Sequence, residues 1–163
     1  MVDTNWIYGP IYGIRTLMAN SAAFRTAVGA ESVEAAKAVI YPFQAYNEDY
    51  DANNSSQPRP RVILSYDQDI SQKEAVSSWS SGYSVTAEFE FTPSSENDQT
   101  AAESFLSTIQ TIVNQMLALE GTENYVIVED MEAAQSVAFS DPDETNEGER
   151  YIWYAVRFAR GLE

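Results

Sequence analysis

Residues 82–91 alternate between apolar and polar side chains, and this alternation constrains the fold more than any other feature of the chain. Successive side chains of a β-strand point to opposite faces, so the segment predicts a strand with one buried face and one face in water. Such a strand is typical of an antiparallel sheet and needs a second layer over its apolar face. The apolar positions are Tyr83, Val85, Ala87, Phe89 and Phe91, and the polar ones are Ser84, Thr86, Glu88 and Glu90.

The long helix that would supply this second layer is predicted directly after the strand. A polar run at residues 94–99 can cap its start, and Gly121 closes it. Its apolar residues recur at intervals of three and four, which predicts one buried face against the strand. These residues are Ala102, Phe105, Ile109, Ile112, Val113, Met116 and Leu117.

Shorter elements are predicted on both sides of this pair. Residues 9–38 are predicted to be helical in two pieces, the first ending at Gly29 and the second capped by Ser32. Strands are predicted at 39–41, 61–66, 125–128 (continuing toward 139) and 151–159. Pro42 either ends the first of these strands or places it at a sheet edge. Residues 67–81 form the polar arm of a wide hairpin. The order predicts an α+β fold: an antiparallel β-sheet with one long helix packed on one face and an N-terminal helical segment.

The length of 163 residues and the 44% hydrophobic content are enough for one domain with its own core. We therefore predict a single α+β domain over residues 1–163, with an N-terminal extension at 1–10. Two segments without apolar anchors, 47–60 and 140–149, are predicted to be long exposed loops.

The chain contains no Cys and no His. Their absence excludes disulfides, ordinary zinc and iron–sulfur sites, and catalysis by Ser-His-Asp or Cys-His groups. There is no phosphate-binding loop or nucleophile elbow either. We therefore expect no enzymatic activity and no cofactor.

The net charge is −16, from 25 acidic and 9 basic residues. Nucleic-acid affinity comes mostly from Lys and Arg that neutralise phosphates, so tight binding of DNA or RNA is not expected. Anionic membrane surfaces are disfavoured for the same reason. No apolar run approaches the roughly 20 residues of a transmembrane helix, and the first residues lack the basic and apolar regions of a signal peptide.

Three patterns resemble functional sites, and each also has a structural interpretation that we favour. Glu88 and Glu90 lie two apart on one strand face, as a glycosidase pair can, but a solvated strand face has the same alternation. Asp141, Asp143, Thr145 and Glu147 have the spacing of oxygen ligands in an EF-hand calcium loop. The Gly required at the sixth loop position is replaced by Asn146, and the Glu at the twelfth by Ile152. An aromatic sugar platform would use Trp79, Tyr83, Trp153 and Tyr154, of which Tyr83 and Trp153 are in phase with apolar neighbours.

With these elements in place, the chain resembles the tail terminator (tail-completion) proteins of long-tailed bacteriophages over residues 12–158. The resemblance lies in element order and local sequence: Ala22-Ala23-Phe24-Arg25 in the helical segment, Pro58-Arg59-Pro60-Arg61-Val62-Ile63-Leu64 entering a strand, and Trp79 before the strand at 82–91. The single long helix and the last hairpin, ending in the strand at 151–158, complete it. The long loop at 47–60 and the residues before Pro10 depart from the most compact members.

The resemblance implies a structural virion protein, assembled in the host cytoplasm, whose ring of commonly six subunits caps the head-proximal end of the tail tube. The implied partners are further copies of the chain, the tail tube protein and the head–tail connector, while DNA passes through the lumen without tight binding. We predict subunit or partner contacts at Arg59, Arg61, Asp67, Asp69, Lys73, Trp79, Arg157 and Arg160. A head–tail connector or neck protein remains an alternative, and a carbohydrate-binding adhesive module or a carboxylate hydrolase is a more distant one.

Overall fold

The structure, a computed structural model, describes residues 6–44, 60–67, 70–75, 78–119, 126–140 and 150–161. The predicted loops 47–60 and 140–149 lie outside these ranges except for Pro60 and Ser140. Arg59, Asp69 and Gly121 also lie outside the described ranges.

Three helices, and not the two predicted pieces, form the N-terminal segment: α1 (Gly9–Asn20), α2 (Ala22–Val28) and α3 (Val33–Lys37). The unpredicted break is at Ser21, where the backbone is extended and the side chain accepts a hydrogen bond from the Phe24 N–H. The Ser21 hydroxyl also donates to Gln115 Oε1 at 2.7 Å, a contact with a distant helix that the local sequence pattern does not contain. The predicted end at Gly29, with φ 68°, and the Ser32 cap are confirmed.

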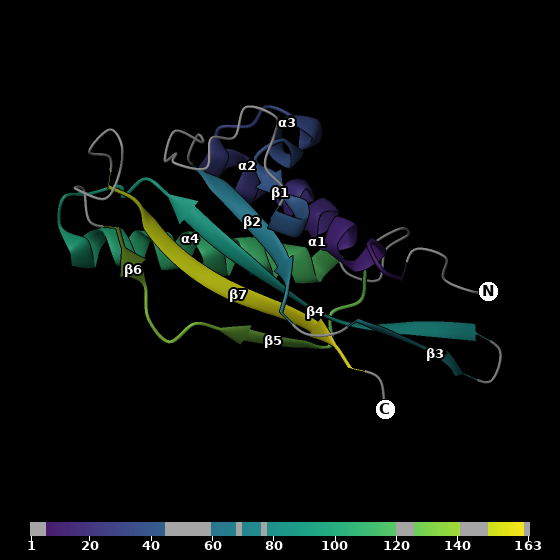
Figure 1. Ribbon diagram of the computed structural model, residues 1–163. Helices are drawn as coiled ribbons and strands as arrows, with labels where there is room; N and C mark the ends of the chain where they lie inside the picture. The colour runs from purple at the N-terminus through teal and green to yellow at the C-terminus, as the bar shows by residue number, and fades with distance from the viewer. Residues whose placement is uncertain are drawn as a thin grey trace.

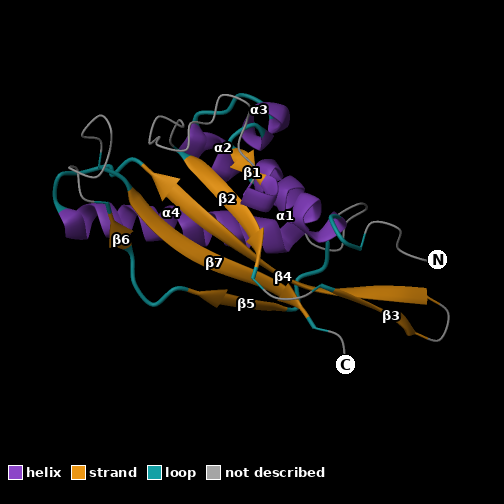
Figure 2. Cartoon of the chain, viewed as in Figure 1, coloured by secondary structure: helices purple, strands orange, loops and turns teal. Residues whose placement is uncertain are grey.

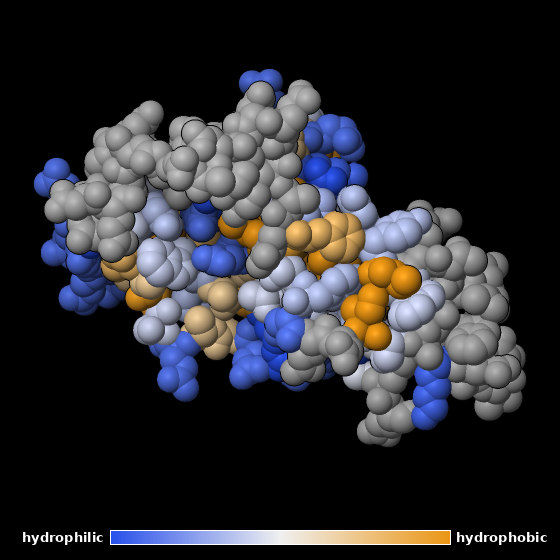
Figure 3. All heavy atoms as spheres, viewed as in Figure 1, coloured by the Kyte–Doolittle hydropathy of each residue, from blue (hydrophilic) through white to orange (hydrophobic). Residues whose placement is uncertain are grey.

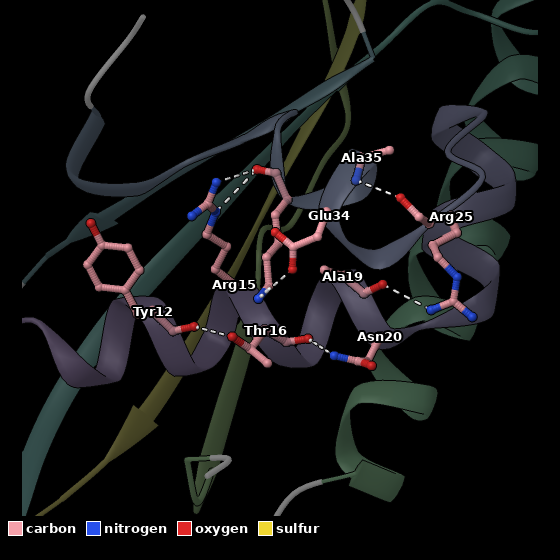
Figure 4. A network of polar contacts seen from close by, with 10 residues as sticks. Tyr12, Arg15, Thr16, Ala19, Asn20, Arg25, Glu34 and Ala35 are labelled. Carbon is pink, nitrogen blue, oxygen red and sulfur yellow. Dashed lines mark hydrogen bonds and ion pairs between the residues drawn. The ribbon is translucent and has the colours of Figure 1, made fainter.

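Polar contacts hold the first helix against the third (Figure 4). Arg15 of α1 donates to the Lys37 carbonyl from Nη2 at 2.7 Å and from Nε at 3.2 Å. Arg25 of α2 donates from Nη1 to the Ala19 carbonyl near the end of α1 at 3.0 Å. Both arginines therefore satisfy carbonyl groups at helix ends.

Within the described residues the sheet has seven strands in the order β1-β2-β4-β7-β5, with β3 pairing β4 and β6 pairing β7 (Figure 1). The main strands are β1 (Ile40–Tyr41), β2 (Arg61–Tyr66), β4 (Ser78–Phe91) and β7 (Ile152–Arg160). The α+β class, the strand at 61–66 and the last strand are confirmed. The sheet is mixed because β1 runs parallel to β2, whereas the other pairs are antiparallel.

The predicted polar arm is itself a β-hairpin. Strand β3 (Ser71–Ala75) pairs with the first residues of β4, from Ser71 opposite Gly82 to Ala75 opposite Ser78. The returning strand thus begins at Ser78, four residues before the predicted start. Figure 2 shows this hairpin extending beyond the helices and the rest of the sheet. The hairpin sequence is mostly polar, and for this reason the apolar alternation did not indicate it.

Helix α4 (Asp98–Leu119) lies on the apolar face of the sheet, as predicted. It begins after Asn97, whose side chain accepts a hydrogen bond from the Thr100 N–H at 3.0 Å. Its buried residues join one core with α1 and the strands, and the Phe105 ring lies 5.2 Å from that of Phe91. None of the described helices is long and apolar enough to cross a membrane.

The strand predicted at 125–128 is wrong over the described residues 126–128, which are irregular. Pairing with β7 forms later, in β5 (Asp130–Ala133) and β6 (Ala138–Phe139). In this irregular segment Val126 lies against Gly13 of α1 and Val128 is buried in the core, whereas the Ile127 side chain is 42% exposed. The Ile127 carbonyl accepts a hydrogen bond from the Tyr83 hydroxyl of β4.

Gly13 permits this close approach of α1, because a Cβ built there would lie 2.1 Å from Val126 Cγ1. Overpacking typically destabilises by about 1–3 kcal/mol, and the higher helix propensity of Ala offsets about 1 kcal/mol of that. We expect Gly13→Ala to lower the free energy of unfolding in urea titration, and Val126→Ala in the same chain to restore part of it. Gly161→Ala, whose Cβ would meet no atom within 4 Å, is the control. Equal stability of the Gly13 and Gly161 variants would contradict this account.

Candidate functional site

The sheet face opposite α4 carries the charged residues of the strands, and Figure 3 views this side of the molecule. The face was predicted to be in water, and that prediction is wrong for Glu90 and Ser84 of β4, which are buried. Thr86 and Glu88 are half-buried. Glu90 lies between Arg61 of β2 and Trp153 of β7 in register, and the Ser84 hydroxyl accepts a hydrogen bond from Arg157 of β7.

Arg61 and Glu90 form a buried ion pair across β2 and β4. They are directly opposite in register, and Arg61 Nε donates to Glu90 Oε2. Each residue is only 6% exposed. Loss of one member of such a buried pair strongly destabilises the fold, since the remaining charge is left without its counter-ion. Arg61 and Glu90 are thus used inside the subunit, which removes Glu90 from a free catalytic carboxylate pair.

Glu88 lies two residues before Glu90 on the same face of β4. Burial raises the pKa of the Glu88 carboxyl, and the nearby Glu90 charge raises it further, while Arg61 acts in the opposite direction. The folded protein therefore favours the protonated form of Glu88 more than the unfolded chain does.

Arg157 of β7 gathers a second group of charges on this face. Its guanidinium donates to Glu132 Oε2 at 2.5 and 3.1 Å and to Ser84 Oγ at 3.2 Å. Asp67 Oδ2 is 3.9 Å from its Nε. The hydrogen bond with Glu132 raises the pKa of Arg157 above its usual range. Arg160, three residues further along β7 and thus on the other face by alternation, pairs with Glu129 at 3.4 Å.

One ion pair that sequence reasoning missed joins the start of α4 to the chain before β7. Arg150 Nη1 lies 2.7 Å from Asp98 Oδ1, and the Arg150 guanidinium lies over the Phe139 ring at 4.4 Å. The hydrogen bond from Arg150 lowers the pKa of the Asp98 carboxyl. The two residues are 52 positions apart, and nothing in the local sequence connects them.

The predicted contact residues are thus divided between two environments. Arg61, Arg157, Arg160 and Asp67 make ion pairs within the subunit. Lys73 is exposed on β3 of the hairpin, and Trp79 lies in β4 opposite Glu74. Lys73 and Trp79 therefore both belong to the hairpin, whereas Arg61, Arg157 and Arg160 belong to the strands β2 and β7.

The calcium and sugar interpretations gain no support from the described residues. Asp141, Asp143, Thr145 and Glu147 lie outside them, and within them no group of three or more acidic side chains could hold a metal ion. Tyr83 and Tyr154 belong to the core side, where their hydroxyls donate to the Ile127 and Ala134 carbonyls. Trp153 neighbours Tyr154 in the strand and points to the opposite face, so these aromatic residues do not form one platform.

An aromatic cluster near the N-terminus, in which Tyr8, Tyr12 and Phe43 are exposed and Tyr66 is half-buried, was not predicted. The ring of Tyr8 contacts that of Tyr12, Tyr12 contacts Phe43, and Phe43 contacts Tyr66. The ring centroids in these three contacts are 5.7 to 6.1 Å apart. Phe43 has φ 59° and ψ 24°, an uncommon conformation for a residue with a side chain. Burial raises the pKa of Tyr66 to about 12. These four residues come from three separate segments, so no sequence motif indicates the cluster.

Comparison with protein-family models finds no matching family, and comparison with curated proteins finds no significant match.

Loss of one member of the Arg61–Glu90 pair should destabilise the fold strongly. We expect Glu90→Leu or Arg61→Met alone to lower the free energy of unfolding by about 3–5 kcal/mol, because each leaves a buried charge. The double variant Arg61→Met with Glu90→Leu should be clearly more stable than the sum of the single losses. Urea denaturation of the four proteins gives the coupling energy. Strict additivity would show that the two side chains do not interact.

Glu88 should make stability depend on pH with a defined sign. The folded pKa is raised, so the native state binds more protons between the unfolded and folded pKa values, and stability falls as pH rises through that interval. We expect Glu88→Gln, which stays neutral, to be more stable than the parent protein at pH 7. This difference should vanish below the ordinary carboxyl pKa. Thermal melts of both proteins from acid to neutral pH test this, and a parallel pH dependence would contradict it.

Proposed function

We propose that the protein is a structural component of a bacteriophage virion, a tail terminator whose ring closes the head-proximal end of the tail tube. The observation that carries the proposal is the hairpin of β3 and β4, which extends from the body as an unsupported arm (Figure 1). The sequence resemblance supplies the role, and the α+β fold is compatible with it.

The arm has the form of an assembly element. A hairpin that projects from its own subunit exposes backbone groups on its outer strand, and such edges pair with other chains. Contacts of one patch with a different patch on the next copy generate a closed ring when the rotation closes. The ring would stop tube growth and provide the surface for head joining, with the tube protein and the connector as its partners.

The charge distribution supports a lumen through which DNA passes without binding tightly. The chain carries −16, and each arginine among the described residues contacts a carboxylate or a carbonyl of its own subunit. Few cations are therefore left to hold phosphates. The proposal assigns no catalytic activity, cofactor or metal to the chain.

Ring formation should strengthen as monovalent salt rises. Net negative subunits repel one another, and the Debye length falls from about 10 Å at 0.1 M to about 3 Å at 1 M. Native mass measurement and sedimentation across a salt series, with and without tail tubes, test this. A protein that stays monomeric throughout and never binds tube ends would overturn the terminator role.

The arm gives this experiment a matched variant. Replacing residues 72–81 with Asn-Gly places a two-residue turn between Ser71 and Gly82, which are directly opposite in register. We expect this variant to keep the melting temperature of the monomer and to lose the ring. Rings of undiminished stability in the shortened variant would show that the arm does not assemble the subunits.

A further inference from the structure

A groove of about 400 Å³ separates α4 from the edge of the sheet. Leu106 and Val113 line it from the helix, and Met131, Ala133 and Val156 line it from the strands. Leu106 is 36% exposed and Met131 39% exposed, so large apolar side chains of both walls reach solvent. The groove therefore offers apolar surface directly beside a strand.

That strand, β5, is an open edge. It pairs with β7 on one side, and no other strand in the described part of the chain pairs with it. Ala134 donates its N–H to the Ala155 carbonyl, and hydrogen-bonded positions alternate along an antiparallel pair. The N–H and C=O groups of Met131 and Ala133 consequently point away from β7. All four residues of β5 are exposed.

Side chains alternate on β5 between the groove and the charged face. Met131, Glu132 and Ala133 all border the groove, but the Glu132 carboxylate pairs with Arg157 on the opposite face, where Asp130 also lies by alternation. Three carboxylates among the described residues, those of Asp67, Asp130 and Glu132, surround the guanidinium group of Arg157, which leaves an excess of negative charge there.

This alternation specifies the side chains of an added strand. Residues beside Met131 and Ala133 would enter the groove and be apolar, and residues beside Asp130 and Glu132 would meet carboxylates and be basic. A second copy of β5 would place like charges together. The chain's own β3, Ser-Gln-Lys-Glu-Ala, has no two large apolar residues at alternate positions. Neither segment of this chain fits.

We propose that the open edge of β5 and the groove beneath it bind an extended segment of another protein, in which apolar residues alternate with lysine or arginine. The segment adds as a strand to β5, so its backbone bonds to Met131 and Ala133 while its apolar side chains fill the groove. This inference does not depend on the assembly role proposed above, because it involves neither the hairpin nor a second copy of the chain.

The test uses the full chain and two synthetic peptides of identical composition. In one peptide valine and lysine alternate, and in the other the lysines precede the valines as a block. Fluorescence anisotropy should give at least about tenfold tighter binding of the alternating peptide, because only this order matches both faces of β5. Amide NMR signals of Met131 and Ala133 should shift on binding. Equal affinities, or no binding of the alternating peptide, would overturn the proposal.

Two variants locate the site. Ala133→Pro removes an N–H that points to the open edge and keeps the bonds to β7, and Leu106→Lys places a charge in the groove. Each should weaken binding of the alternating peptide by about tenfold. Ser107 is exposed on the neighbouring side of α4, and Ser107→Lys should leave the affinity unchanged. Circular dichroism checks folding, and if the proline variant unfolds, Leu106→Lys decides. Unchanged affinity in Leu106→Lys would overturn the proposal.

Discussion

Val85, Ala87 and Phe89 of β4 are closed off from water by α1 and α4, and the remaining elements are arranged around this burial. β4 pairs with β2 on one side and with β7 on the other. A slip of one residue in either pairing would move every apolar side chain of that neighbour to the opposite face. Burial of one face of β4 thus determines how β2, β4 and β7 are aligned with one another.

The charged face of the sheet is a consequence of the same register. Once Phe89 is held opposite Val62, Glu90 must lie opposite Arg61, and the two form their ion pair in a place closed to water. The alignment of β7 with β5 in turn places Arg157 beside Glu132. The few cations of an acidic chain are in this way used to hold strands together, and the excess of carboxylates is left at the surface.

The two proposals concern different parts of the sheet boundary. The hairpin of β3 and β4 extends the sheet past its helical cover, which suits contact with another copy. The β5 edge lies over an apolar groove against α4 and carries carboxylates on alternate residues, which suits a basic strand from another protein. Both depend on backbone groups left without a partner at strand edges, where the described structure is open to addition.

The sequence alone determined the elements whose period is set by their own burial: the strand within β4, the helix α4 with its apolar stripe, β2, β7, and the caps at Gly29 and Ser32. Local spacing carries this information because each of these residues faces the core or caps its own helix. The tertiary structure alone decided the break at Ser21, the burial of Glu90, the irregular path at 126–128, the hairpin strand β3 and the groove beside β5. Each of these depends on a partner far along the chain, Gln115, Arg61 or Gly13 among them, or on polar residues whose pairing leaves no apolar period to detect.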